Sequence, residues 1–129
     1  MTDTAYRDLA ARLDALPDGF PPTDDGAELR LLAKLFTPQE AELAAKLRLT
    51  LETPRQIATR IDSDPKAVRD ELKAMAKRGL IATGRVERGL GYGLMPFVVG
   101  IYEMQVERMD EELALLFETY YLKAFGEVL

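Results

Sequence analysis

Apolar positions at helical spacing predict a helix over residues 4–16, followed by a second helix before residue 37. The apolar positions of the first helix are Tyr6, Leu9, Leu13 and Leu16. They recur three and four residues apart, which places them on one helix face, and Pro17 ends the helix. Residues 17–22 have the composition of a turn, and Asp24 or Asp25 is placed to cap the second helix. The apolar positions of this second helix are Leu29, Leu32, Ala33 and Phe36.

Three short motifs predict the starts of further helices. Residues 37–40 (TPQE) and 53–56 (TPRQ) each place Thr at the N-cap and Pro at the first helical position. The Glu or Gln three residues after each cap can reach back to the cap's N–H. Asp64-Pro65 joins a capping oxygen to a fixed φ, without the reciprocal Glu or Gln. We therefore expect helices over residues 38–48, 54–61 and 65–78.

A helix-turn-helix and a hairpin follow from these starts. Only three residues separate the 54–61 helix from the 65–78 helix, and each has one apolar side. Gly79 ends the second of them, and two strands then run over residues 80–86 and 92–95. Gly89-Leu90-Gly91 is the expected turn between the strands, at a flexible tip. A helix-turn-helix followed at once by a hairpin is the order of a winged helix.

The last third of the chain has the spacing of a coiled-coil seam. Its apolar positions alternate at intervals of three and four, which is typical of a/d positions over three heptads. They are Val99, Tyr102, Val106, Met109, Leu113, Leu116 and Tyr120. The alternative to one continuous helix is a break near residues 108–110, because Asp110 can cap a new helix. We expect this seam to be a homodimer interface rather than to pack on residues 4–16, because Tyr and Met are common in interface cores.

These elements predict one mostly α domain over residues 1–129. Its fold class is a winged helix-turn-helix with a two-stranded hairpin wing and long N- and C-terminal helices. Residues 1–36 form the N-terminal helices, residues 37–96 the helix-turn-helix and wing, and residues 97–129 the C-terminal dimerisation helix or helices.

The composition excludes several chemistries. The 129 residues include no Cys and no His, which removes zinc and iron–sulfur ligation, thiol nucleophiles and every imidazole base. Carboxylate pairs such as Asp24-Asp25 point apart on a helix, and the glycine run at residues 89–93 lacks the Lys and Ser/Thr of a phosphate loop. We therefore expect no enzyme, no cofactor and no metal site.

The chain also lacks the features of a membrane or secreted protein. Charged residues occur throughout the first 30 positions, where a secretory segment would be apolar. The longest uncharged run, residues 89–102, is shorter than the roughly 20 residues that span a bilayer. We expect a cytoplasmic protein with no membrane partner.

Charge is segregated along the chain although its net value is only -5. Residues 55–88 hold nine Lys and Arg against five Asp and Glu, whereas the rest holds eight against seventeen. A basic helix and a basic wing are what contact with DNA phosphates requires. The candidate contacts are Lys66, Arg69, Lys73, Lys77, Arg78, Arg85 and Arg88. The alternative is an ordinary solvated helix face.

Base readout is poorly supported by the same helix. Residues 65–78 contain no Asn, Gln, Ser or Thr, so the amides that read adenine are missing there. Arg69 is the one good candidate for contact with guanine.

Five segments resemble a known group of proteins. They are residues 16–23 (LPDGFPPT), 28–30 (ELR), 35–44 (LFTPQEAELA), 75–81 (MAKRGLI) and 97–103 (FVVGIYE). This pattern resembles the N-terminal region of ferredoxin-type proteins with four-iron four-sulfur clusters, over roughly residues 6–121. In that group a winged-helix-like segment precedes a Cys-rich dicluster domain that transfers electrons. Because this chain has no Cys, no cluster-binding residue can be carried over, and the resemblance implies a redox-linked setting only.

Two functions follow from the sequence. The first is a non-catalytic regulatory module of transcription-regulator type that binds DNA through the basic helix and wing. The alternative is a dimerisation or docking domain of a ferredoxin-type electron-transfer protein. Its partner would be a redox protein or a ferredoxin domain that follows in the same chain.

Overall fold

The computed structural model describes residues 2–17 and 19–125, with backbone only at residues 2, 3, 98 and 99. The chain is mostly helical, as predicted, with one two-stranded antiparallel sheet. The elements are α1 (Thr2–Asp14), α2 (Ala27–Leu35), α3 (Pro38–Ala44), α4 (Pro54–Ile61), α5 (Pro65–Lys77), β1 (Ala82–Val86), β2 (Gly89–Gly93), a π-helix η1 (Phe97–Tyr102), α6 (Glu103–Gln105), a 3-10 helix η2 (Val106–Arg108) and α7 (Glu111–Phe125). No helix in these residues is long and apolar enough to cross a membrane.

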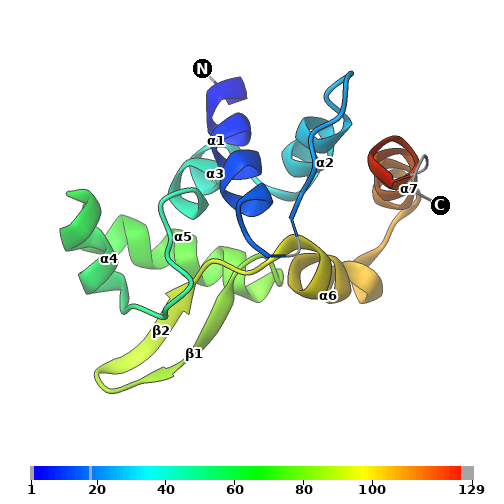
Figure 1. Cartoon of the computed structure of the whole chain (residues 1–129). Helices are drawn as coiled ribbons and strands as arrows, with labels where there is room; N and C mark the ends of the chain where they lie inside the picture. Colours follow the sequence, from blue (N-terminus) through cyan, green and yellow to red (C-terminus); the bar gives the residue numbers. More distant parts are fainter. Residues whose placement is uncertain (1, 18, 126–129) are drawn as a thin grey trace.

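The helices form two groups that α3 connects. α1 packs on α2 and α3, and α2 packs on α7, whereas α4 packs on α5. α3 contacts both α1 and α5. The hairpin extends away from the helices on the side of α4 and α5 (Figure 1). One end of the molecule therefore consists of α4, α5 and the hairpin, and the other of the terminal helices.

The predicted helix starts are confirmed. Thr37 and Thr53 form complete capping boxes with Glu40 and Gln56, and the Asp64 carboxylate accepts a hydrogen bond from Ala67 N at 2.9 Å. These motifs are local, so the first turn of each helix is set by residues adjacent in sequence.

The predicted end of α5 at Gly79 is also confirmed. Gly79 has a φ of +74°, in the left-handed region that favours glycine. The N–H groups of Gly79 and Leu80 donate to the carbonyls of Ala76 and Met75, which is the hydrogen-bond pattern of a Schellman motif.

The cap of α2 differs from the prediction. Gly26 is the N-cap, with a φ of 77° and no side-chain hydrogen bond, so neither Asp24 nor Asp25 caps the helix. The Thr23 hydroxyl instead accepts from Ala27 N at 2.8 Å, and the Glu28 carboxylate accepts from Thr23 N at 2.9 Å. The turn at Gly26 brings Thr23 within reach of the helix start, which the capping pattern in the sequence did not indicate.

The predicted extent of α3 is wrong. The helix ends at Ala44 rather than near residue 48. Arg48 O accepts a hydrogen bond from Leu94 N at 2.8 Å, and Glu52 pairs with Tyr92 in an isolated β-bridge. Residues 48–52 therefore lie along the hairpin, and this pairing ends the helix early.

The predicted turn of the hairpin is also wrong. β1 and β2 pair from Ala82↔Gly93 to Val86↔Gly89, so the turn lies at residues 87–88 and the glycines lie within β2. A Cβ at Gly93 would lie 2.9 Å from Arg48 O, and one at Gly91 would lie 3.0 Å from Leu51 Cβ. The glycine run thus permits close approach of residues 48–52 and is not a flexible tip.

The C-terminal seam is broken, as the alternative prediction allowed. Met109 is extended, with a φ of -68° and a ψ of 119°, between η2 and α7. The Asp110 carboxylate accepts from Leu113 N at 2.7 Å and caps α7. The spacing of three and four therefore spans four helical segments rather than one helix.

The seam positions do not form one outward surface. Leu113 and Tyr120 are buried in the chain's own core. The Tyr120 ring lies 4.9 Å from that of Phe20, its hydroxyl donates to Pro21 O at 2.8 Å, and burial raises its pKa. The other described seam positions are Tyr102, Met109 and Leu116, which pack partly on this core, and Val106, which is exposed. The side chain of Val99 lies outside the described residues.

We predict that Gly93→Ala lowers the free energy of unfolding by about 1–3 kcal/mol, because its Cβ meets the backbone oxygens of Arg48 and Leu49. Gly84→Ala is the matched control, since its Cβ meets only the flexible end of Leu51 at 3.1 Å. Urea unfolding followed by circular dichroism measures both. Equal losses in the two variants would contradict the close packing of residues 48–52 on β2.

Candidate nucleic-acid interface

The Lys and Arg side chains fall into two groups, those with a partner in the chain and those without. Ten of the seventeen have a hydrogen bond or another electrostatic partner, such as Lys34 with Glu112 at 2.5 Å. Within residues 2–17 and 19–125, the side chains without one are Arg55, Lys66, Arg69, Lys73, Lys77, Arg85 and Arg88. We call these seven the free cations. All seven are exposed and lie on α4, α5 and the hairpin.

The middle of this group is a stripe along α5. Arg69, Lys73 and Lys77 are four residues apart and share one face, and Lys66 lies one turn earlier. The opposite face buries Val68, Leu72 and Met75, which fixes the stripe toward solvent.

The acidic residues of α5 do not neutralise the stripe. Asp70 forms no ion pair with it among the described residues. Glu71 lines a groove with Leu43 of α3 instead, where burial first, then Glu40 and Glu42, raise its pKa. The stripe therefore keeps its positive charge.

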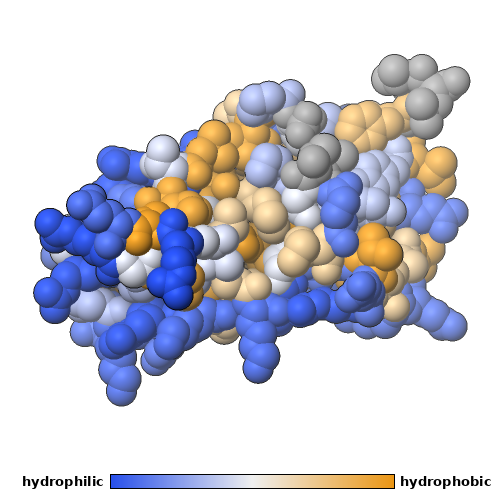
Figure 2. Space-filling model, turned by 90° about the horizontal axis from the view of Figure 1, so that it is seen from below, coloured by the Kyte–Doolittle hydropathy of each residue, from blue (hydrophilic) through white to orange (hydrophobic). Residues whose placement is uncertain are grey.

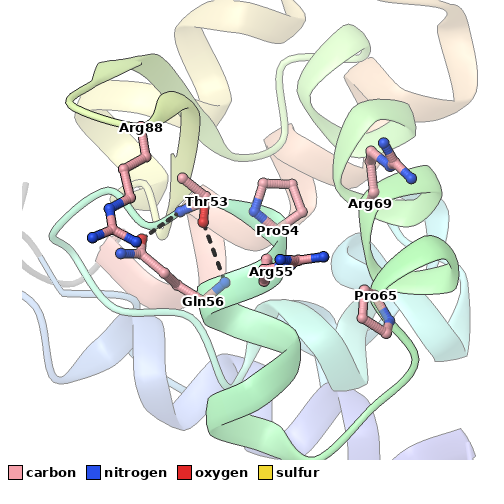
Figure 3. A pocket seen from close by; sticks show the side chains of 7 residues that line it. All are labelled: Thr53, Pro54, Arg55, Gln56, Pro65, Arg69 and Arg88. Carbon is pink, nitrogen blue, oxygen red and sulfur yellow. Dashed lines mark hydrogen bonds between the residues drawn. The ribbon is translucent and has the colours of Figure 1, made fainter.

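A cleft of about 410 Å³ lies at the end of this stripe, where α4, α5 and the hairpin turn converge. Its lining is Thr53, Pro54, Arg55, Gln56, Pro65, Arg69 and Arg88. Figure 3 shows the Arg88 guanidinium beside the Gln56 amide, and Arg69 on the facing helix. No carboxylate is among these lining residues, so three guanidinium groups share one hollow without a counter-charge.

The capping box of α4 forms one wall of the cleft. Thr53 N donates to Gln56 Oε1 at 2.9 Å and Gln56 N donates to Thr53 Oγ1 at 3.2 Å (Figure 3). Both acceptor oxygens are thus occupied. The Gln56 amide NH₂ has no partner in the described chain and remains a donor.

The hairpin is held in place by Glu52. Its backbone exchanges two hydrogen bonds with Tyr92, at 3.0 and 2.7 Å, and its carboxylate accepts from Arg60 Nε and Nη2 at 3.1 and 2.7 Å. Because Arg60 belongs to α4, these contacts fix the hairpin relative to α4. They place Arg88 over the cleft, with Arg85 outside it on β1.

Figure 2 shows how polar groups are distributed on the face seen from below Figure 1. Hydrophilic residues gather at the end that holds α4 and the hairpin and along one long edge, whereas hydrophobic residues lie between them and toward α7 (Figure 2). The end that holds α4 and the hairpin is therefore a hydrophilic surface.

One of the predicted contact residues pairs within the fold, and one arginine of the cleft was not predicted. The Arg78 guanidinium binds the buried Glu40 carboxylate, and its Nε is buried without a partner. Arg78 therefore connects the end of α5 to α3. Arg55 lies in the cleft but was not named from the sequence. Its position directly after the Thr53-Pro54 helix start was the available signal.

Comparison with protein-family models, curated proteins and solved structures found no match. The resemblance to the N-terminal region of ferredoxin-type proteins therefore stays a prediction from the residues.

We predict that Arg78→Gln destabilises the fold, whereas Lys77→Gln does not. Arg78→Gln leaves Glu40 buried with fewer donors and lowers the free energy of unfolding by about 1–3 kcal/mol. Lys77→Gln changes it by less than about 0.5 kcal/mol, because that side chain is exposed and has no partner. Urea unfolding measures both values. A larger loss in Lys77→Gln would contradict the assignment of Arg78 to the fold.

Proposed function

We propose that this chain is a non-catalytic winged-helix module that binds duplex DNA through its phosphate backbone. One observation carries the proposal: every free cation of the described chain lies on α4, α5 or the hairpin. A paired cation must break its internal contact before it binds a phosphate, whereas a free one exchanges only water and counterions. DNA phosphates can therefore bind the seven free cations without breaking an ion pair or hydrogen bond within the protein.

The order of elements supports this orientation of DNA. α4 and α5 are joined by three residues, with Asp62 in the left-handed region at a φ of 56°, and the hairpin follows directly. In this proposal α5 is the recognition helix and the hairpin is the wing. The acidic remainder of the chain repels phosphates, so it favours approach from the basic end only.

The proposed binding is weakly selective for sequence. α5 carries no amide or hydroxyl side chain toward solvent, and Arg69 is its one residue suited to guanine. Backbone contacts position a protein on DNA without reading bases. We propose a cytoplasmic regulatory role in which further sequence selection comes from outside α5.

A homodimer is the second part of this proposal, with its surface revised. The buried seam residues are used within the chain, but Leu115 and Leu122 lie seven residues apart on α7 and are 63% and 66% exposed. The two leucines occupy the same heptad position on one helix face, with Glu118 and Thr119 between them, and in this proposal each meets its copy on the partner helix. The revised surface is therefore the outer side of α7.

We predict salt-dependent binding of a random duplex in fluorescence anisotropy. If all seven free cations contact phosphates, log K falls with log salt concentration with a slope of about -6. Lys73→Gln and Lys77→Gln each reduce the magnitude of the slope by about 1. Lys46→Gln is the matched control, since this exposed lysine follows α3, is not one of the free cations and pairs with Glu42 at 3.6 Å. Absence of binding at about 50 mM salt would refute the function and favour the docking alternative.

We predict that Leu115→Glu combined with Leu122→Glu converts the dimer to a monomer in light scattering. Charged side chains on the facing stripes repel each other, whereas the fold is retained because both positions are exposed. Leu90→Glu is the control, at an exposed leucine of the hairpin. The same mass for wild type and the double variant would contradict this interface.

A further inference from the structure

The arginine cleft differs in kind from the lysine stripe beside it. The stripe is an exposed helix face, whereas the cleft is a hollow with one arginine from each of three elements: Arg55 from α4, Arg69 from α5 and Arg88 from the hairpin turn. Three separate segments thus converge on one volume. Such convergence suits a compact ligand more than an extended surface.

No carboxylate of the described chain lines the cleft. Of the nearby ones, that of Glu52 binds Arg60, and that of Asp64, just before Pro65, accepts from Ala67 N. Glu87 precedes Arg88 in the chain but does not line the cleft. Three guanidinium groups around one hollow repel each other unless an anion lies between them. The cleft is therefore electrostatically complementary to an anion.

The donor set favours a phosphoryl group over a carboxylate. Each guanidinium presents a planar fork of N–H donors, and the Gln56 amide adds two more. A carboxylate has two oxygens for these donors, whereas a phosphoryl group has three or four and can be shared by several forks. The lining thus has more donors than a carboxylate can use.

The walls of the cleft indicate what is attached to the phosphoryl group. The rings of Pro54 and Pro65 also line it, with Pro54 between Arg88 and Arg69 and Pro65 below Arg69 (Figure 3). Its volume of about 410 Å³ lies in the range of small-molecule sites, so it exceeds what a single anion needs. A sugar or base attached to the phosphate would pack against the prolines.

We propose that this cleft is a discrete binding site for the phosphoryl group of a nucleotide. The nucleotide is either part of a bound DNA strand or free in solution, and the chemistry of recognition is the same in both cases. The first case rests on the proposed function, whereas the second does not. In the first case the cleft sets the register of the protein on DNA, and the stripe adds affinity.

The test uses the full chain and the variants Arg69→Gln and Arg55→Gln/Arg88→Gln. Arg85→Gln is the matched control, because Arg85 is also exposed and free but lies outside the cleft. In one arm, calorimetry titrates a nucleoside 5′-monophosphate, with the unphosphorylated nucleoside as the ligand control. In the other arm, anisotropy measures random duplex affinity at one salt concentration.

We expect the cleft variants to lose at least tenfold in affinity in one or both arms. Arg85→Gln loses less than threefold for the monophosphate, and in the duplex arm it loses less than the cleft variants, as expected for one backbone contact. Loss in the monophosphate arm identifies a free nucleotide as a ligand, and loss in the duplex arm alone identifies a backbone nucleotide. Equal behaviour of Arg69→Gln and Arg85→Gln in both arms would overturn the site while leaving general DNA binding intact. Monophosphate binding without any duplex binding would refute the proposed function and retain the site.

Discussion

The pairing of Glu52 with Tyr92 is the constraint on which the basic end of the molecule depends. It holds residues 48–52 as an extended segment beside β2. This segment can approach β2 only because Gly91 and Gly93 have no side chains there. The carboxylate of the same Glu52 binds Arg60 of α4. Glu52 therefore connects the hairpin to α4 through both its backbone and its side chain. Without this contact the cleft would have no fixed third side.

The distribution of ion pairs explains how an acidic protein presents a basic face. Partly or fully buried acids engage arginines within the fold, as Glu52 engages Arg60 and Glu40 engages Arg78. These pairs support the packing of α3, α4 and α5, and their charged groups are not available to bind a ligand. The remaining cations of the same segment have no such acids within reach. The net charge of -5 is therefore the sum of a neutralised interior, an acidic end and a free basic end.

The sequence predicted the features that depend on neighbouring residues. Capping boxes, the Schellman end of α5 and the stripe along α5 each involve positions within one or two turns, so their chemistry is visible in the motif. The hairpin turn was misplaced because Gly91 and Gly93 make room for backbone about 40 residues earlier in the chain, which local turn propensity does not report. The C-terminal seam was misread for a similar reason. Its spacing is real, but Tyr120 packs on Phe20, a residue about 100 positions away, and no local pattern reveals that contact.

The cleft shows why part of the candidate site escaped sequence reasoning. Its walls are the helix starts themselves: Pro54 and Pro65 are the first residues of α4 and α5, and Gln56 completes a capping box. In the sequence, these residues are fully explained as helix-start motifs. Nothing in those motifs indicates that Arg55 beside them lines a cleft. Only the packing of α4 on α5, with the hairpin held by Glu52, brings Arg55, Arg69 and Arg88 around one volume. The cleft therefore arises where the starts of α4 and α5 pack together. Its charged groups belong to residues beside those that form the helix starts, as Arg55 is beside Pro54.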